Sequence, residues 1–564
     1  MAEQKPTYAD RPWQKSYKLG PYPLAKTVDY PKQPIYKFLD DSSDKYPDNV
    51  VLLFQKKRMT YKELRIYVDK LAAGLAGLGV KKGDRVVTMV PNCPQIIVSE
   101  YGVAKAGAVY VPLTPLSKAF ELEHVLKESG AEVIITLEDY LDIVNSVKDK
   151  TNLREIIIST RKDFTLEEEP EIKEVPGTRN FRRLLEENEA KPPEIEIDPM
   201  KDLATLAFTG GATGVPKGVM RTHYNETCSS MCSFPWLLKP MEAGARSKAS
   251  FLTAMPLYHG AGRCFIDMAV YWTMRFILLP DPRDTDAIIS AIQEYRPFVC
   301  IAVPTQLMRM VQKKVGKTNS LVSTGAAPVP KETADLWKKE TGMPATQGYG
   351  ITEGGQMMNL SAFSKLTGFM PVEKHSLGVP VPDLDVKLVD PETGKDVPFG
   401  ETGEIWFRGP QVMVGYWPTF GNGLTDGWYP TGDVARMDED GYFFMEDRVK
   451  DMISVSGLKV YSCVVDEVLF KHPAVAMAVA IGIPDPEIPG SERVKAYIKV
   501  RDDYEGEVTA EEIIAHCRAN LPPYAAPRFV EFREELPLTA SEKLFKRALR
   551  EEEITKMKAE GKFK

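Results

Sequence analysis

The chain has 564 residues, of which 43% are hydrophobic and 27% are charged, and its formal net charge is -7. One hydrophobic core rarely supports this length, so at least two domains are expected. The absence of a basic excess argues against nucleic acid and anionic membranes as partners, although local groups can still grip a polyanionic ligand.

Two further features bear on the compartment. The seven cysteines are scattered without a CxxC pair, which favours a reducing environment over a disulfide framework or a structural zinc site. The N-terminus has no apolar signal region, and no run of about 18 apolar residues occurs, so neither a secretory leader nor a membrane-spanning helix is expected. The sequence therefore predicts a cytoplasmic protein with no transmembrane segment.

The N-terminal half alternates between helical and strand patterns. After about 30 residues that read as an extended surface segment, residues 59–80 have apolar side chains at helical spacing and end near Gly79. Residues 81–91 follow as a turn and a Val-rich strand, and residues 96–113 and 123–137 each repeat a helix and a strand. This alternation predicts a parallel α/β sheet with both faces covered.

Further along the chain the pattern changes twice. Residues 167–199 are acidic and proline-rich, and they read as a surface connection without a buried strand. A pattern typical of a β-strand appears again over residues 202–210. Short strands between glycine and proline turns then predict a small β subdomain over residues 379–417.

A compact unit with its own alternation of strands and helix follows Lys450. Its helix has Thr509 and Glu512 at capping-box spacing. The predicted fold is thus α/β, with a large N-terminal domain of parallel α/β sheets plus a β subdomain over residues 1–449. A small α+β C-terminal domain is predicted over residues 450–564.

A glycine-rich loop over residues 208–218 is the first candidate site. Its sequence is FTGGATGVPKG, and it follows an apolar strand. The four glycines let backbone N–H groups wrap around phosphate oxygens, while Lys217 adds a positive charge and Thr213 a hydroxyl. Because Lys217 stands in no GK[ST] element, the loop is not a P-loop. The alternative is an exposed glycine-rich turn without a ligand.

The second candidate site is QGYGITEGG, over residues 347–355. Tyr349 stands between two glycines, where its ring can offer a face to a flat base. Thr352 and Glu353 place a hydroxyl beside a carboxylate. A carboxylate near phosphates repels a nucleotide unless a cation lies between them, so Glu353 is a candidate Mg²⁺ ligand. The alternative is a β-turn with an exposed glutamate.

Three charged residues nearer the C-terminus complete the candidate set. Asp433 follows a glycine turn in YPTGDVARM and has two oxygens suited to the hydroxyls of a ribose. Arg448 can add a hydrogen bond to the sugar or to a phosphate. Lys543, in PLTASEKLFKRALR, is predicted to open a basic amphipathic helix. For each of them the alternative is a solvated surface charge.

The order of these motifs along the chain is more specific than any one of them. It runs FTGGATGVPKG, STGAAPVP, GYGITE, YPTGDVA, DRVKDMI, SGLKVY and SEK, so nearly the whole chain resembles the adenylate-forming superfamily. That group contains acyl-CoA synthetases, beetle luciferases and the adenylation domains of peptide synthetases. The resemblance implies an AMP-forming carboxylic acid–CoA ligase, an acid–thiol ligase that uses ATP, Mg²⁺ and coenzyme A and releases AMP and pyrophosphate.

The resemblance also implies a role for each motif. The glycine-rich loop holds the β- and γ-phosphates, Tyr349 stacks on adenine, and Asp433 and Arg448 contact the ribose. Thr352 and Glu353 contact the α-phosphate and Mg²⁺. The implied nucleotide- and CoA-binding residues are Thr209, Gly211, Thr213, Gly214, Lys217, Gly325, Ala326, Tyr349, Asp433, Arg448, Lys450, Gly457 and Lys459. The implied acyl-pocket residues are His259, Ala327, Gly348, Gly350 and Gly354.

The implied catalytic residues are Lys543, Thr352 and Glu353, and the resemblance makes the C-terminal domain mobile. Lys543 would bridge the substrate carboxylate and the α-phosphate during adenylation. Rotation about a hinge at Lys450 would then withdraw Lys543 and bring the SGLKVY loop, with Gly457 at its turn, beside the CoA thiol.

Several positions depart from the pattern of the family. Gly210 and Ala212 stand where serine and threonine are common, which removes two hydroxyl contacts from the phosphate loop. Ser462 and Val464 replace a proline and a glutamate after the hinge loop, and the sequence assigns no consequence to them. Backbone donors of the phosphate loop remain, so function is expected to persist.

Glu542 is the departure with the largest expected effect, because a glycine usually precedes the catalytic lysine. Glu542 and Thr539 have capping-box spacing, which predicts that a helix starts here and stiffens the approach to Lys543. Two alternatives follow. Either the enzyme tolerates the stiffer approach, or adenylation is impaired and the protein is a non-catalytic nucleotide or acyl binder.

The residues expected to line the pocket indicate which acid the protein takes, and the chain length indicates its acceptor. The pocket positions, which by analogy include residues 258–263, are mostly small and uncharged, which favours a medium- or long-chain fatty acid over an amino acid. Arg263 meets either a polar tail or water, and an aromatic or short hydroxy acid stays an alternative.

The chain ends soon after Arg550, which leaves no room for a fused carrier domain and favours CoA as acceptor. An acyl-AMP ligase that delivers to a separate carrier protein is the alternative. Homodimers are common in such families, whereas the sequence shows no self-complementary patch.

Overall fold

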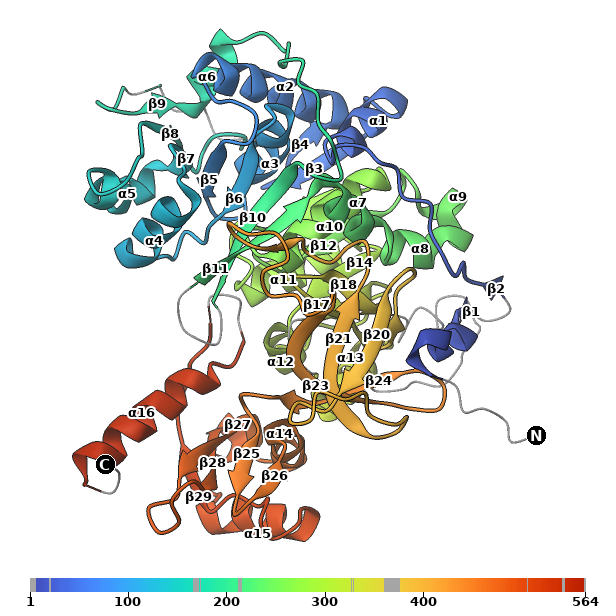
Figure 1. Cartoon of the computed structure of the whole chain (residues 1–564), viewed down its shortest axis with the longest axis vertical. Coiled ribbons are helices and arrows are strands. Elements are labelled where there is room, and N and C mark those ends of the chain that lie inside the picture. The colour runs from blue at the N-terminus through green and yellow to red at the C-terminus, as the bar shows by residue number, and fades with distance from the viewer. Residues whose placement is uncertain are drawn as a thin grey trace.

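The computed structural model describes residues 7–19, 22–165, 172, 174–210, 216–325, 327, 329–359, 376–504, 506–539 and 543–561. Two large sheets with their helices form the N-terminal part, and a β subdomain follows. A smaller C-terminal unit, orange to red, lies at the lower end of the long axis (Figure 1). In the described part of the chain, no helix is both long and apolar enough to cross a bilayer.

The first sheet has eight described strands in the order β22-β11-β10-β6-β5-β7-β8-β9. Strands β10, β6, β5, β7, β8 and β9 run parallel, while β11 and β22 join antiparallel at one edge. The strands are β5 Arg85–Met89, β6 Val109–Pro112, β7 Val133–Leu137, β8 Glu155–Ser159, β9 Arg179–Asn180, β10 Leu203–Gly210, β11 Pro216–Thr222 and β22 Gly415–Tyr416.

The helices of this half begin where their sequence signals lie. Thr60 caps the helix that begins at Tyr61, and its hydroxyl accepts a hydrogen bond from the Glu63 N–H at 3.2 Å. Gly79, at φ +79°, follows the helix end. The helices and 3-10 turns are α1 Lys37–Lys45, α2 Tyr61–Gly77, α3 Pro94–Lys105, α4 Ala119–Ser129, η3 Glu138–Tyr140, α5 Leu141–Lys148 and α6 Phe181–Glu187. The predicted helix–strand alternation is thus confirmed.

The second sheet has the described strand order β16-β15-β14-β12-β13-β3-β4 and is parallel except for the β3–β4 hairpin. Its strands are β3 Val50–Phe54, β4 Lys57–Thr60, β12 Ser250–Thr253, β13 Arg275–Leu278, β14 Val299–Ala302, β15 Leu321–Thr324 and β16 Ala345–Gln347. Its helices are α7 His223–Met231, α8 Phe234–Leu238, η4 Lys239–Met241, α9 Glu242–Ala245, α10 Gly260–Tyr271, α11 Thr285–Tyr295, α12 Pro304–Gln312 and α13 Lys331–Thr341.

The β subdomain extends further along the chain than predicted. Its antiparallel sheet has the order β20-β21-β23-β24 and ends at Arg448, because the strands after residue 417 complete it. A smaller sheet, β17-β18-β19, lies beside it. The strands are β17 Tyr349–Ile351, β18 Gly355–Asn359, β19 Val379–Pro380, β20 Asp385–Val389, β21 Thr402–Arg408, β23 Tyr429–Met437 and β24 Phe443–Arg448.

The C-terminal unit has its own core of residues such as Val465, Leu469, Ile498 and Ile513. Its sheet has the order β27-β28-β29, and the predicted capping box at Thr509 is confirmed. The elements are β25 Ile453–Val455, β26 Leu458–Val460, α14 Ser462–Phe470, β27 Val475–Pro484, β28 Glu492–Val500, η6 Asp502–Tyr504, α15 Ala510–Asn520, β29 Phe529–Phe532 and α16 Lys546–Ala559.

Two segments that read as surface are packed. The lead-in contains η1 Tyr8–Asp10, η2 Pro12–Ser16, β1 Lys18–Leu19 and β2 Tyr22–Pro23, and its Trp13 is fully buried against Phe443. Within residues 167–199, helix α6 buries Phe181 and Leu185. A few large apolar side chains anchor both otherwise polar segments. The extended lead-in was a wrong prediction, whereas the described residues of 167–199 contain no buried strand, as predicted.

Candidate functional site

The β17–β18 hairpin carries the GYGITEGG motif and forms the centre of the candidate site. Its turn contains Thr352, Glu353 and Gly354, and the Gly354 N–H donates to the Ile351 carbonyl at 3.2 Å. A methyl group on Gly350 would lie 2.5 Å from the Gly355 carbonyl oxygen, so only glycine lets the two strands approach this closely.

Tyr349, Asp433 and Arg448 meet beside this hairpin. The Tyr349 hydroxyl donates to Asp433 Oδ2 at 2.6 Å, and Arg448 Nε donates to Asp433 Oδ1 at 2.6 Å. Strands β23 and β24 place Asp433 directly opposite Arg448. Burial opposes the charge of Arg448, but the Asp433 carboxylate outweighs it and raises the pKa of Arg448. Asp433 is only 3% exposed, which excludes the alternative of a solvated loop residue.

Glu353 is tied to the first sheet through Tyr416. The Tyr416 hydroxyl donates to Glu353 Oε1 at 2.8 Å and lies 3.1 Å from the Tyr429 hydroxyl. Lys217 Nζ lies 5.2 Å from the centre of the same Tyr416 ring. The metal candidate and the lysine of the phosphate loop therefore share one tyrosine.

The phosphate loop joins strands β10 and β11. Thr209 pairs with Lys217 in the register of this hairpin, which places both at its loop end. Gly211, Thr213 and Gly214 were predicted here from the sequence and lie outside the described residues.

The predicted acyl-pocket residues gather around the same hairpin. A methyl group on Gly260, the first residue of α10, would lie 3.3 Å from Thr352 Oγ1. His259 stands at the N-cap position of this helix without a side-chain hydrogen bond to it, and burial followed by the charge of Lys543 lowers the pKa of His259 to about 4. It is therefore neutral near pH 7.

Glycines bring the ends of strands β15 and β16 together behind the hairpin. The Gly348 N–H donates to the Thr324 carbonyl at 2.8 Å, and a methyl group on Gly325 would lie 3.4 Å from the Gly348 carbonyl oxygen. Ala327 is half-buried in the turn that follows β15. Ala326 lies outside the described residues.

Lys543 lies among the charges of this site, but not at the start of a helix. Burial and the Arg448 guanidinium lower its pKa to about 8, while Asp433 and Glu353 act in the opposite direction. The Lys543 N–H donates to Thr539 Oγ1 at 3.2 Å, and the Thr539 N–H donates to the Lys543 carbonyl at 2.8 Å. The helix predicted at Lys543 begins only at Lys546, because this turn engages the Thr539 side chain first. Glu542 lies outside the described residues.

Comparison with known proteins assigns the chain to a family. Residues 39–417, more than half of the chain, match the family described as AMP-binding enzyme, and residues 464–543 match the AMP-binding enzyme C-terminal domain. The chain belongs to the AMP-binding enzyme family.

Curated relatives match this AMP-binding enzyme along most of its length. A long-chain-fatty-acid–CoA ligase of Yersinia pestis is 34% identical and covers 92% of this chain and 94% of its own. One from Bacillus subtilis is 32% identical over 97% of this chain and 98% of its own. A feruloyl-CoA synthase of an Amycolatopsis species is 32% identical over 87% of this chain and 93% of its own.

Solved structures of two enzymes share the fold. An anthranilate CoA ligase in complex with anthranoyl-AMP aligns with a TM-score of 0.81 at 23% identity, covering 97% of this chain and 99% of its own. The ATP-bound MatB of Rhodopseudomonas palustris aligns with a TM-score of 0.80 at 23% identity, covering 92% of this chain and 98% of its own. Both support the α/β fold with a large N-terminal and a smaller C-terminal domain.

Two predicted residues of this AMP-binding enzyme lie on another hairpin, β25–β26. Gly457, at φ +84°, forms its turn, where a left-handed residue is required. Lys459 Nζ lies 2.7 Å from Glu392 Oε1 in the loop after β20, so it pairs with the β subdomain and not with the nucleotide residues. Lys450 is exposed in the turn between β24 and β25, next to Arg448.

The sequence did not predict two side chains that support this AMP-binding enzyme's site, Tyr416 and Arg221. Tyr416 lies 63 residues from Glu353 in no recognised motif. Arg221 donates to the Thr352 carbonyl oxygen at 3.2 Å from strand β11. A charged residue in the apolar strand pattern VMRT is a signal that could have found Arg221, because a buried arginine needs partners.

The departure at Ser462 has a structural counterpart in this AMP-binding enzyme. The Ser462 hydroxyl donates to Asp447 Oδ1 at 3.0 Å, and Lys546 Nζ donates to the Ser462 hydroxyl at 2.7 Å. Lys546 also pairs with Asp466 at 2.8 Å. The serine thus connects strand β24, before the hinge position, with the helix that follows Lys543. The structure explains nothing about Val464.

Proposed function

We propose that this AMP-binding enzyme is a fatty acid–CoA ligase that forms AMP. It activates a carboxylic acid with ATP and transfers the acyl group to coenzyme A. The observation that carries the proposal is the place of Lys543, a half-buried cation close enough to interact electrostatically with Asp433, Glu353 and His259. The long-chain-fatty-acid–CoA ligases of Yersinia pestis and Bacillus subtilis support the choice of acid.

The nucleotide fits the residues present. Asp433 offers a buried carboxylate beside Arg448, an arrangement suited to the two hydroxyls of a ribose. Tyr349 is half-buried next to both, and its ring is the proposed stacking partner of adenine. Lys217, at the end of the glycine-rich hairpin, supplies positive charge for the β- and γ-phosphates.

Glu353 is the proposed protein ligand of Mg²⁺. Within the described residues no group of three or more His, Cys, Asp or Glu side chains is arranged to hold a metal ion. An ion at Glu353 therefore takes its other ligands from phosphates and water, as Mg²⁺ commonly does. When bound, the ion neutralises phosphate charge. Tyr416 holds the carboxylate in place through Oε1.

In the first half-reaction, a carboxylate oxygen of the acid attacks the α-phosphorus of ATP and pyrophosphate leaves. Two anions must meet, so positive charge has to be present where they approach. Lys543 supplies that charge from the C-terminal side of the site, and Thr352 offers a hydroxyl from the hairpin turn. His259 is neutral near pH 7 and places no charge at the mouth of the acyl pocket.

In the second half-reaction, the CoA thiolate attacks the acyl carbonyl carbon and AMP leaves. We propose that the domain boundary lies between residues 449 and 450 and that the C-terminal domain rotates about Lys450. The rotation moves Gly457 and Lys459 toward the thiol. The Lys459–Glu392 pair is largely exposed and therefore offers little resistance to it. We further propose a cytoplasmic location, supported by seven free cysteines, and leave a homodimer as a prediction.

The test is a turnover assay with ATP, Mg²⁺, CoA and acids from acetate through palmitate to ferulate, with products identified by mass spectrometry. We expect acyl-CoA and AMP with a fatty acid, and their loss in Lys543→Ala. A preference for ferulate would favour the aromatic acid that the Amycolatopsis relative suggests. Acyl-AMP without acyl-CoA would favour a carrier-protein acceptor. Nucleotide binding without any product would favour the alternative of a non-catalytic nucleotide or acyl binder.

A further inference from the structure

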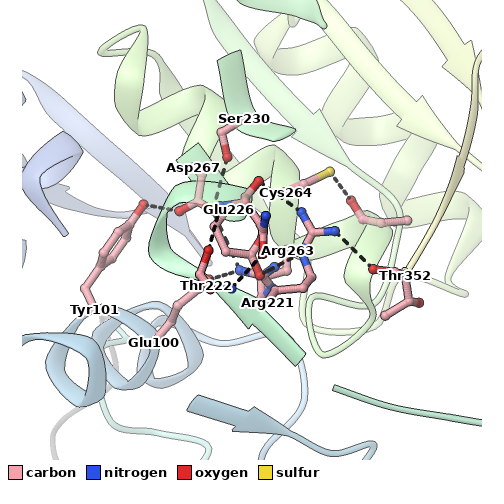
Figure 2. A network of polar contacts seen from close by, with 12 residues as sticks. Glu100, Tyr101, Arg221, Thr222, Glu226, Ser230, Arg263, Cys264, Asp267 and Thr352 are labelled. Atoms are coloured by element: carbon pink, nitrogen blue, oxygen red, sulfur yellow. Dashed lines mark hydrogen bonds and ion pairs between the residues drawn. The ribbon is translucent and has the colours of Figure 1, made fainter. Parts of the chain in front are cut away.

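A cluster of buried charges lies beside the turn of the β17–β18 hairpin, residues 352–354, which we call the catalytic turn (Figure 2). We define the buried charge cluster as Glu100, Arg221, Glu226, Arg263 and Asp267, each at most 4% exposed. Its members come from α3, β11, α7 and α10. The prediction that Arg263 meets a polar tail or water is wrong, because it pairs with the three carboxylates.

Glu226 connects the two arginines of the cluster. Its Oε1 lies 2.5 Å from Arg263 Nη2 and 3.1 Å from Arg221 Nε. Burial would raise the pKa of Glu226, but Arg221 and Arg263 outweigh it and lower the pKa to about 2. Glu226 is therefore ionised near pH 7, and its ion pair with Arg221 restrains the guanidinium.

The restrained Arg221 guanidinium in turn forms a hydrogen bond to the catalytic turn. Its Nη1 donates to the Thr352 carbonyl oxygen at 3.2 Å and its Nη2 donates to the Asn225 carbonyl oxygen at 3.3 Å (Figure 2). The next carbonyl of the turn, that of Glu353, accepts from the Met413 N–H at 2.7 Å. Arg221 also lies four residues after Lys217 on β11, so one strand carries the phosphate lysine and the support of the turn.

We propose that Arg221 is a positioning residue for adenylation. Held by Glu226, its guanidinium keeps the Thr352 hydroxyl and the Glu353 carboxylate at a set distance from Lys217. Three contacts in three directions require the planar fork of arginine, because a lysine has one nitrogen and cannot reach Glu226, Asn225 and Thr352 together. The inference rests on the proposed roles of Thr352 and Glu353.

The test compares Arg221→Lys with Tyr101→Phe. Tyr101 donates to Asp267 Oδ1 at 2.8 Å at the far end of the cluster, so its loss disturbs the same buried region without touching the turn. Three quantities are measured: amide hydrogen exchange of residues 349–355, the Mg²⁺ concentration for half-maximal pyrophosphate release, and conversion of supplied acyl-AMP to acyl-CoA. Glu226→Gln provides a second variant if Arg221→Lys folds poorly.

We expect Arg221→Lys to speed exchange in the turn, to raise the half-maximal Mg²⁺ concentration about tenfold and to leave the acyl-AMP conversion within about twofold of wild type. Tyr101→Phe should lower the melting temperature but leave the exchange of the turn, the half-maximal Mg²⁺ concentration and the acyl-AMP conversion at their wild-type values. Unchanged exchange in Arg221→Lys, or the same changes in Tyr101→Phe, would overturn the inference. A wild-type protein that forms no acyl-AMP would refute the proposed function, while the exchange experiment would still decide whether Arg221 holds the turn.

Discussion

Lys543 lies among charges of both signs, and its protonation is set by that balance. Burial and Arg448 disfavour the ammonium form, whereas Asp433 and Glu353 favour it, and the pKa falls to about 8 from the usual 10.5. The proton is therefore held less tightly in the folded protein than in the unfolded chain. At neutral pH the side chain is still mostly charged, as the proposed adenylation requires, but a small rise in pH begins to neutralise it.

This balance predicts an alkaline limit to adenylation. The kcat/KM for pyrophosphate release without CoA should be level below about pH 8 and fall as the pH rises through that value, because the neutral amine cannot offset two approaching anions. The Lys543→Arg enzyme should catalyse adenylation more slowly, but its kcat/KM should not fall at alkaline pH, since a guanidinium keeps its proton. An identical alkaline limb in the arginine variant would assign the titration to another group.

At the scale of elements, the β17–β18 hairpin depends on close packing against helix α7. Gly355 has φ +62°, and a methyl group there would lie 2.0 Å from Ser229 Oγ and 3.2 Å from Arg221 Nη2. Just beyond the end of α7, the Ser233 hydroxyl donates to Gln356 Oε1 on the next residue. The helix thus sets the position of the strand, and the strand sets the position of the catalytic turn.

Gly355→Ala should therefore destabilise the protein and displace the turn. The left-handed backbone costs about 1–2 kcal/mol, and overpacking against α7 adds about 1–3 kcal/mol. Gly490→Ala is the matched control, since Gly490 has φ +81° with nothing within 4 Å of an added methyl group. Gly355→Ala should lower both the free energy of unfolding measured in urea and the rate of pyrophosphate release. Gly490→Ala should lower only the free energy of unfolding, and by a smaller amount. Equal effects would mean that the packing against α7 is unimportant.

At the scale of the whole molecule, three contacts among the described residues illustrate how the C-terminal unit is joined to the rest. Met308 of α12 packs in the C-terminal core, and the exposed Lys459–Glu392 pair connects the two parts. Ser462 bonds to Asp447 beside the connecting turn. Because the exposed pair contributes little, we propose that the orientation that brings Lys543 to the site can be exchanged for another.

Lys450→Pro tests that exchange. A proline at the connecting turn restricts the backbone, so thioester formation from supplied acyl-AMP should fall by at least about tenfold while adenylation falls less. Lys450→Ala, which removes the side chain and keeps the backbone free, should retain both half-reactions. Equal losses in the proline variant would refute a hinge here, and a matching loss in the alanine variant would assign the effect to the lysine charge.

Local patterns predicted much of the fold and the candidate residues. The helix after Thr60, the strand at residues 85–89 and the capping box at Thr509 follow from side-chain periodicity and caps over a few neighbouring residues. Patterns failed where a distant partner decided. Trp13 is buried because Phe443 lies beside it. Patterns also failed where one local interaction competed with another, since the turn at Thr539 delays the start of the helix after Lys543.

The sequence by itself determined the family, the order of the motifs and the residue types at Lys217, Glu353 and Asp433 on which the proposed chemistry rests, because each depends on residue type and local spacing. Only the tertiary structure decided which side chains hold that chemistry in place. Arg221 supports a carbonyl 131 residues away, and Tyr416 supports a carboxylate 63 residues away. Such pairs depend on how two sheets and a β subdomain pack together, and no local pattern carries that information.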